Sequence, residues 1–147
     1  LWYWTGDPTK KWEPLNLGHQ KVVSYFYAPS IALPTDIAGV STSSTSSIWY
    51  DSSTEFFNVK LFDIYVQQFS LAGNVSGTTR TALKSPSALN LPVLKSSNLD
   101  YFITYFDNQV FDPSTITLDD NGVLKYKLVV SPTITEESFM NIIFKVK

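Results

Sequence analysis

Apolar and polar positions alternate most regularly in the stretch ITLDDNGVLKYKLVV. After its turn, apolar residues occupy every second position and are predicted to share one face of a strand: Leu124, Tyr126, Leu128 and Val130. Lys125 and Lys127 fall between them and are predicted to face solvent. The dipeptide Asn121-Gly122 supplies the positive φ values of a tight turn between two strands. This pattern predicts a β-hairpin.

The last segment of the chain repeats the alternation. One predicted face is apolar and consists of Met140, Ile142, Phe144 and Val146. The opposite face is mostly polar and consists of Asn141, Ile143, Lys145 and Lys147. Two further segments, KVVSYFYAP and LDYFITYFD, are short and rich in aromatic and β-branched residues, and they end at Pro29 and Asp107-Asn108. All three are predicted to be strands bounded by turns.

The run FFNVKLFDIYVQQF changes the phase of its apolar positions in the middle. Phe57, Val59 and Leu61 share one parity, whereas Phe62, Ile64 and Val66 share the other. A β-bulge or a strand bend between Leu61 and Phe62 would return these side chains to one buried face, so we predict a single bulged or bent strand. The alternative is an amphipathic helix that uses Phe56, Val59, Phe62, Val66 and Phe69. The run is poor in helix-forming Ala, Glu and Lys, which favours the strand.

The segments between these strands have the composition of loops. SIALPTDIAGVSTSSTSS carries a Ser/Thr tract, and AGNVSGTTRTALKSPSALNLP is similar. There is no internal repeat and no sharp linker. Short strands, turn-rich connections and little helical periodicity predict an all-β protein: a single antiparallel β-sandwich domain of immunoglobulin-like type over residues 1–147, with long Ser/Thr-rich loops. Residues 1–14 are expected to form an N-terminal arm or an edge strand.

Composition narrows the range of partners. Charged residues make up 16% of the chain, against about 25% in an average domain. The cations are scattered singly apart from Lys10-Lys11, so there is no basic stripe for nucleic acid. The absence of cysteine excludes disulfides and thiol chemistry. No apolar run reaches about 18 residues, so no transmembrane helix is predicted. Because the chain begins at Leu1 rather than Met, we expect a processed or trimmed amino end, and the sequence leaves open whether a signal peptide or anchor segment was removed.

Catalytic and metal-binding patterns are weak. His19 is the sole histidine and precedes a predicted strand, where it is expected to be a surface residue rather than a general base. The acidic stretches DDNG and DNQVFD offer oxygen ligands for calcium, but neither has a full calcium-loop pattern, and the first is explained by its hairpin turn. We therefore predict no enzyme activity, no metal and no cofactor. The sequon at Asn74 leaves glycosylation open.

The opening LWYWTGDPTKKWEP is unusually aromatic. In an extended LWYW segment both faces are apolar, so the segment is expected to pack as a strand, either in its own sandwich or against the open sheet edge of a neighbouring chain. Gly6 and Pro8 stop a membrane-surface helix at once. Sugar rings stack on exposed aromatic side chains, which makes a carbohydrate platform the third interpretation. The candidate binding residues are Trp2, Tyr3, Trp4, Trp12, Trp49 and Tyr50.

The hairpin ITLDDNGVLKYKLVV resembles the closing hairpins of bacterial surface and secreted immunoglobulin-like or β-sandwich modules, which often read as a short strand, a D/N-G turn and a G-x-L-x-Y strand. The resemblance covers about a tenth of the chain and implies a surface or secreted module with a binding or scaffolding role. Together with the low charge and the abundant aromatics, it predicts an extracellular or cell-surface protein that acts by protein contact as a structural or accessory subunit or homo-oligomer. The alternative is a carbohydrate-binding module.

Overall fold

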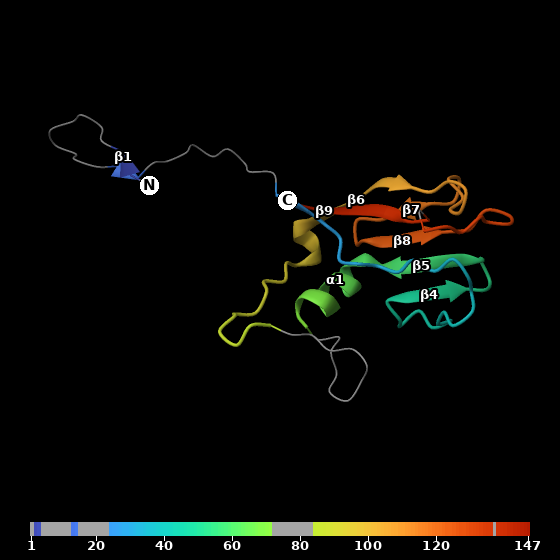
Figure 1. Cartoon of the computed structure of the whole chain (residues 1–147), viewed down its shortest axis with the longest axis horizontal. Helices are drawn as coiled ribbons and strands as arrows, with labels where there is room; N and C mark the ends of the chain where they lie inside the picture. Colours follow the sequence, from blue (N-terminus) through green and yellow to red (C-terminus); the bar gives the residue numbers. More distant parts are fainter. Residues whose placement is uncertain (1, 4–12, 15–23, 72–83, 137) are drawn as a thin grey trace.

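The computed structural model describes residues 2–3, 13–14, 24–71, 84–136 and 138–147. The described residues form mostly β-strands, arranged in one antiparallel sheet of three strands and one of four. They also include one short α-helix and a separate pair of two strands. Figure 1 shows the strands of both larger sheets running side by side and the helix at one end of them. The all-β prediction is confirmed at this level.

The four-stranded sheet has the order β4-β5-β8-β7. Its strands are β4 (Ile48–Asp51), β5 (Phe56–Lys60), β8 (Val123–Tyr126) and β7 (Thr117–Leu118). Phe57 of β5 lies opposite Tyr50 of β4 on one side and Tyr126 of β8 on the other. These three aromatic residues point to the same face, which is the face that packs into the core.

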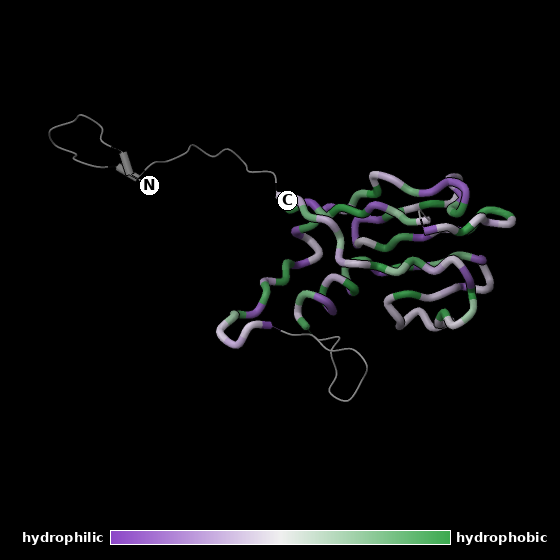
Figure 2. The backbone as a smooth tube through the Cα atoms, in the orientation of Figure 1, coloured by the Kyte–Doolittle hydropathy of each residue, from purple (hydrophilic) through white to green (hydrophobic). Residues whose placement is uncertain are grey.

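The three-stranded sheet has the order β3-β9-β6. Its strands are β3 (Tyr25–Tyr27), β9 (Met140–Val146) and β6 (Leu99–Phe106), and a short 3₁₀ turn, η1 (Ser96–Asn98), leads into β6. Hydropathy alternates along the strands (Figure 2), and Met140, Ile142 and Phe144 of β9 are buried as predicted. The register of β6 on β9 shifts between Ile103 and Tyr105, so Thr104 is a β-bulge.

The amino-terminal residues form a small sheet of their own. β1 (Trp2–Tyr3) pairs with β2 (Glu13–Pro14), with Trp2 opposite Pro14 and Tyr3 opposite Glu13. Neither strand belongs to the larger sheets. The packing of the aromatic side chains of LWYW, in this chain or in a neighbour, stays a prediction.

The prediction of a single bulged strand over residues 56–69 is wrong, because the run divides into a strand and a helix. β5 ends at Lys60, and α1 (Leu61–Phe69) begins at the next residue. The phase change in the sequence therefore marks the change from the two-residue period of a strand to the 3.6-residue period of a helix. α1 buries Leu61, Ile64 and Tyr65, which share one face at helical spacing.

The predicted hairpin between residues 117 and 126 is confirmed, but its turn is longer than an Asn-Gly turn. Gly122 has a positive φ of 74°, whereas Asn121 does not. The N–H of Gly122 donates to the carbonyl oxygen of Asp119, and the Asp119 carboxylate accepts the N–H groups of Asn121 and Val123. The Gly122 carbonyl in turn accepts the N–H of Leu61 at 2.9 Å, so the turn holds the start of α1.

The buried face predicted downstream of this turn ends earlier than expected. Leu124 and Tyr126 are fully buried, but Val130 is 96% exposed. β8 ends at Tyr126, and Leu128 is joined to Phe111 by an isolated bridge instead of continuing a strand. Val130 lies beyond the end of β8, so the inward and outward alternation of that strand does not apply to its side chain.

The Ser/Thr-rich segment from residue 30 to residue 47 is a loop, as predicted, but it also covers part of the core. Ile31, Leu33 and Val40 pack against the buried cluster. The hydroxyl of Tyr126 donates to the carbonyl oxygen of Pro34 at 2.8 Å. The loop thus supplies both apolar contacts and an acceptor for a buried phenol.

One aromatic core joins α1 to the three-stranded sheet. The ring of Phe144 lies 5.5 Å from that of Phe26, 5.8 Å from that of Tyr65 and 5.1 Å from that of Tyr101. The buried cluster also contains Phe57, Val59, Leu124 and Tyr126 from the four-stranded sheet. The inner faces of both sheets and the helix therefore contribute to the same core.

Two core tyrosines make opposite use of their hydroxyl groups. The Tyr126 hydroxyl has its acceptor at Pro34, whereas the buried Tyr101 hydroxyl has no hydrogen-bond partner among the described residues. Burial raises the pKa of both phenols. We expect Tyr101→Phe to raise the free energy of unfolding by about 1 kcal/mol and Tyr126→Phe to lower it by about 1 kcal/mol. Urea unfolding of both variants checks this, and a shift in the same direction for both would contradict it.

Among the described residues, no helix has the length and apolar character needed to cross a membrane.

Candidate functional site

The structure describes only part of the aromatic set that the sequence proposed as one platform. Trp4 and Trp12 lie outside the described residues. The backbones of Trp2 and Tyr3 form β1. Trp49 and Tyr50 are consecutive residues of β4 and therefore point to opposite faces of the four-stranded sheet. These last two cannot stack on the same face of one ligand.

Trp49 lies on the outer face of its sheet, where the chain itself covers part of the ring. The ammonium group of Lys60 lies 5.1 Å from the ring centroid, within the range of a cation–π contact. The same ammonium donates to the carbonyl oxygen of Ser44 at 2.8 Å. A ligand that stacked on this side of Trp49 would have to displace Lys60.

Tyr50 lies on the inner face, and its ring is 4.9 Å from that of Phe57. It lines a surface pocket of about 380 Å³, which we call the turn pocket because it lies beside the turn between β4 and β5. The lining residues are Thr35, Asp36, Ile37, Tyr50, Glu55, Phe57, Lys127, Leu128 and Pro132. Two aromatic rings, a hydroxyl group and charged side chains of both signs thus meet in one hollow.

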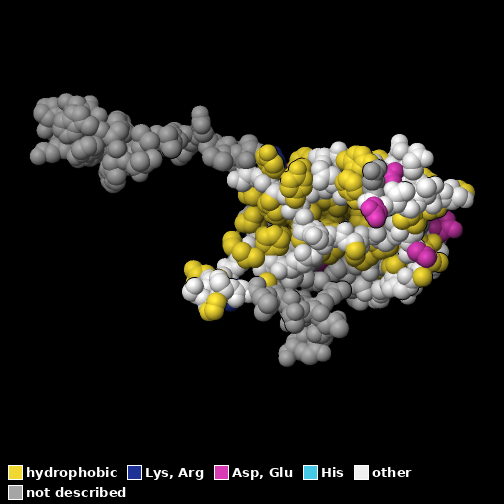
Figure 3. Space-filling view, viewed as in Figure 1, with side chains coloured by type: hydrophobic (Ala, Val, Ile, Leu, Met, Phe, Trp, Pro, Cys, Tyr) yellow, Lys and Arg dark blue, Asp and Glu magenta, His cyan; other side chains and the backbone are white. Residues whose placement is uncertain are grey.

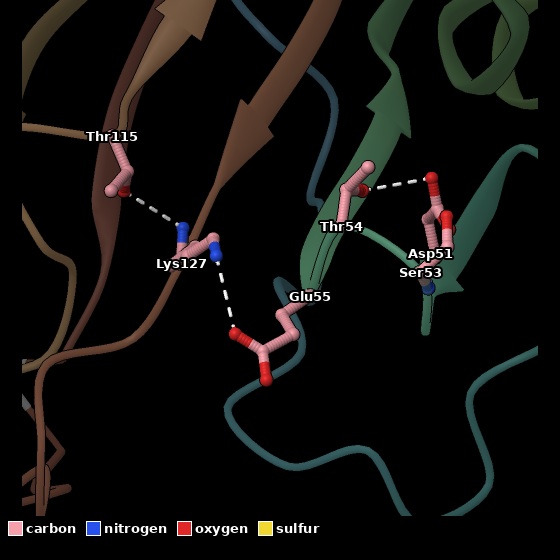
Figure 4. Close-up of polar contacts among 6 residues, drawn as sticks. All are labelled: Asp51, Ser53, Thr54, Glu55, Thr115 and Lys127. Atoms are coloured by element: carbon pink, nitrogen blue, oxygen red, sulfur yellow. Dashed lines mark hydrogen bonds and ion pairs between the residues drawn. The ribbon is translucent and has the colours of Figure 1, made fainter.

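An ion pair stands at the rim of the turn pocket (Figure 4). The Glu55 carboxylate lies 3.3 Å from the Lys127 ammonium, and that ammonium lies 5.0 Å from the centroid of the Phe56 ring. The backbone N–H of Lys127 donates to the hydroxyl of Thr115 at 2.9 Å. Glu55 has a positive φ of 61°, a conformation that costs a non-glycine residue energy. The fold therefore places a carboxylate and an ammonium where they neutralise each other.

Asp51 fixes the turn that carries Glu55. Its carboxylate accepts hydrogen bonds from the hydroxyl groups of Ser53 and Thr54 and from the backbone N–H of Ser53 (Figure 4). These hydrogen bonds favour the ionised form and lower the pKa of Asp51 to about 2. The carboxylate is therefore a turn-capping group and is unsuited to act as a base near neutral pH.

The acidic residues of the two stretches that the sequence offers as calcium ligands also cap turns. Asp107 accepts the N–H of Gln109, and Asp112 accepts both the N–H and the hydroxyl of Ser114. Asp119 caps the hairpin turn described above. Over the residues that the structure describes, no three acidic or histidine side chains are grouped as a metal site would require. His19 lies outside those residues.

Among the residues that the structure describes, several exposed aromatic side chains gather on one surface that the sequence analysis did not identify. It lies on the outer face of the three-stranded sheet, and we call it the outer aromatic face. Its residues are Tyr25, Tyr27, Phe102, Tyr105, Phe139 and Ile143. Tyr27, Ile143 and Phe102 lie in register across all three strands. Tyr27 is 67% exposed and Phe102 is 43% exposed, so these rings are open to a partner.

Polar groups border this face on two sides. Lys145, opposite Tyr25, pairs with Asp100 at 3.7 Å in the row next to Tyr27. At the other end, the rings of Tyr105 and Phe139 lie 5.1 Å apart. Beside them is a smaller pocket of about 270 Å³, lined by Tyr105, Asp107, Gln109, Thr133 and Thr135. Hydrophobic side chains also reach the surface over a broad part of the view in Figure 3.

A sequence signal for this face was present. In SYFYA, Tyr25 and Tyr27 flank Phe26, so both faces of the strand are aromatic. Period-two alternation then shows that one aromatic face must be exposed if the strand covers a single core. The sequence alone does not show that β3 and β6 both lie beside β9, which is what joins their outer rings into one surface.

Comparisons with known proteins returned no match to a family model, to a curated protein or to a solved structure.

Proposed function

We propose that this protein is a non-enzymatic, extracellular or cell-surface β-sandwich that acts through protein–protein contact, as a structural or accessory subunit of a larger assembly. The observation that carries the proposal is the outer aromatic face. Aromatic side chains are enriched at the centres of protein interfaces, where they bury much area at little cost in side-chain entropy. Single exposed apolar residues are ordinary, but five exposed aromatic residues on one sheet face, with the half-buried Ile143 among them, form a patch.

The arrangement of charge supports a protein partner for this face. Asp100 is engaged with Lys145 and Lys147, at 3.7 and 3.4 Å, beside the apolar row. Unpaired charges therefore do not have to be desolvated at the centre of the patch when a partner binds. A polar rim around an apolar centre is the usual arrangement of a protein interface.

The sandwich architecture is part of the proposal. Its support is the shared core, to which the inner face of each larger sheet contributes. A two-layer packing of this kind leaves each sheet one outward face. An immunoglobulin-like order of strands is proposed on the strength of the hairpin resemblance alone.

The test is a substitution in the centre of the outer aromatic face. We expect Tyr27→Asp to leave the protein folded, since this side chain is already exposed, and to abolish capture of a partner from the envelope or secreted fraction of the source. The matched control is Val130→Asp, at a 96% exposed apolar position outside the face. Affinity capture with quantitative mass spectrometry measures both variants. A partner lost equally with both, or retained with Tyr27→Asp, would contradict the proposal.

Carbohydrate binding is the alternative function, and the turn pocket is the observation that favours it. Sugar sites combine an aromatic ring with side chains that hold hydroxyl groups, and the pocket offers Tyr50 beside Thr35 and Asp36. Titration with an oligosaccharide panel, followed by intrinsic fluorescence, separates the two functions. Unchanged fluorescence at millimolar glycan would remove this alternative.

A further inference from the structure

The hydrogen bonds of β9, the central strand of the three-stranded sheet, show which backbone N–H and C=O groups of β3 and β6 point toward it and which point away. The N–H of Val146 donates to the carbonyl oxygen of Ser24, and the carbonyl oxygen of Ile142 accepts the N–H of Ala28. Successive residues of an antiparallel strand alternate between its two neighbours. The even-numbered residues of β9 are therefore bonded to β3, and the odd-numbered residues are bonded to β6.

The same alternation leaves one edge of β6 unpaired. Asp100 lies opposite Lys145 and Phe102 lies opposite Ile143, so these two residues of β6 direct their N–H and C=O groups to β9. Leu99, Tyr101 and Ile103 direct theirs away from the sheet. Apart from the Leu99 N–H, which donates to Ser96, none of these outward groups has a hydrogen bond within the part of the chain that the structure describes.

The other edges of the two sheets are shorter or already occupied. At the β4 edge, the outward N–H of Tyr50 donates to the carbonyl oxygen of Ser41 at 2.8 Å. β3 and β7 are edge strands of three and two residues. β6 has eight residues, and it carries neither proline nor lysine to block further pairing.

The unpaired stretch of β6 has defined ends. The 3₁₀ turn η1 precedes Leu99, and the bulge at Thr104 follows Ile103. The free ladder therefore runs over residues 99–103, with Tyr101 at its centre. A strand that pairs with it must itself present about five residues with alternate groups free.

We propose that β6 pairs antiparallel with β6 of a second copy of this chain, about a two-fold axis that passes beside Tyr101. In this register the two Tyr101 residues exchange a pair of hydrogen bonds. The Ile103 N–H of each copy then reaches the Leu99 carbonyl oxygen of the other. The free ladder begins and ends at the same residues in both copies, so the interface is closed. Every outward group within it finds its complement except the Leu99 N–H, which donates to Ser96, and the Ile103 carbonyl oxygen, which would lie opposite that N–H.

The side chains of the outer face agree with this register. Phe102 of one copy lies opposite Asp100 of the other, so no like charges face each other across the axis. Asp100 already has Lys145 and Lys147 as partners in its own chain, and its carboxylate therefore enters the pairing neutralised. The pairing would join two three-stranded sheets into one and would make the two outer aromatic faces continuous.

This inference rests on the proposed protein-contact role, because it names a second copy as one partner, but it uses the edge of the sheet and not the outer aromatic face. The two can therefore fail separately. If the outer aromatic face itself holds the copies together, any charge placed on it will separate them. If the edge does so, the effect depends on the sign of a charge placed opposite Asp100.

The experiment compares Phe102→Asp with Phe102→Lys by sedimentation velocity over a concentration series, with thermal melts as the check on folding. We expect a wild-type dimer. Phe102→Asp is expected to weaken it by about tenfold or more, because an aspartate then faces Asp100 on both sides of the axis. Phe102→Lys is expected to keep the dimer at least as tight as the wild type. Tyr27→Asp, which lies on β3 away from the edge, is expected to leave the dimer unchanged.

Two results would overturn the inference. One is a wild-type protein that stays monomeric at several hundred micromolar. The other is equal weakening by Phe102→Asp and Phe102→Lys, which would assign the contact to the outer aromatic face and leave the proposed function intact. A dimer with the expected sign dependence, in a protein that captures no other partner, would support the edge pairing and count against the accessory-subunit role.

Discussion

Replacement of Phe144 by alanine is expected to lower the free energy of unfolding by about 3–5 kcal/mol, the usual cost of emptying a buried phenylalanine site. Phe144 is fully buried and contacts rings from β3, β6 and α1. The cavity would therefore lie where three elements meet and could not close by movement of one of them. Since a whole domain is stable by about 5–15 kcal/mol, such a loss brings the protein close to unfolding.

Thermal and urea unfolding measure this effect, and Phe139→Ala is the matched control. Phe139 is 50% exposed and has one ring neighbour, Tyr105, so its removal is expected to cost less than about 1 kcal/mol. The melting temperature of Phe144→Ala should fall by about 10 °C or more. Similar losses for the two variants would show that Phe144 is not at the centre of the core.

Gly122→Ala is expected to give the second large loss, about 2–4 kcal/mol. Gly122 has a φ of 74°, which costs an alanine about 1–2 kcal/mol. A Cβ at this position would also lie 2.7 Å from two carbon atoms of the Tyr101 ring. That ring is held between the turn and Phe144, so relief of the overlap requires the hairpin to shift, at a further cost of about 1–3 kcal/mol.

Gly39→Ala separates the two causes. Gly39 has nearly the same φ, 76°, but a Cβ there meets no atom within 4 Å. It should therefore show the backbone cost alone, about 1–2 kcal/mol. The difference between the two variants in urea unfolding measures the contact with Tyr101. Equal losses would mean that the ring moves aside freely.

The strands that the sequence predicted well are those with one wet and one apolar face. In β9, Met140, Ile142 and Phe144 are all buried, and the lysines that alternate with them reach solvent. The hairpin was predictable for the same reason, since Gly122 needs a positive φ and the strands on both sides alternate. The local alternation of apolar and polar residues is therefore sufficient to predict a strand and its buried face where the opposite face is exposed to solvent.

The change from β5 to α1 could not be predicted from local pattern. A bulged strand and a strand followed by a helix place nearly the same residues on the inner side around Leu61. What decides between them is tertiary: the Leu61 N–H donates to Gly122, far along the chain, and Tyr65 fits beside Phe144. A bulge does occur in the protein, at Thr104 of β6, where the sequence shifts from Ile103 to Phe106 on the inner side.

An aromatic binding surface could be predicted from the sequence in kind. The residues named for it were those of the opening segment together with Trp49 and Tyr50, and a binding role for them stays a prediction. The outer aromatic face, proposed above for protein contact, could not be located from the sequence, because Tyr25, Tyr27 and Phe102 become neighbours only through β9. Which aromatic residues share a surface depends on strand order, and one sequence does not reveal strand order.

The position of β9 has a consequence for how the protein is made. β9 is the central strand of its sheet, but it follows both of its neighbours, β3 and β6, in the sequence. While the chain is being translated, β3 and β6 have no strand to pair with until Val146 has left the ribosome. Such long-range pairing is slow, and unpaired strands in a waiting chain invite aggregation. We therefore expect the three-stranded sheet to be completed only after β9 has been synthesised, whatever the other elements have formed by then.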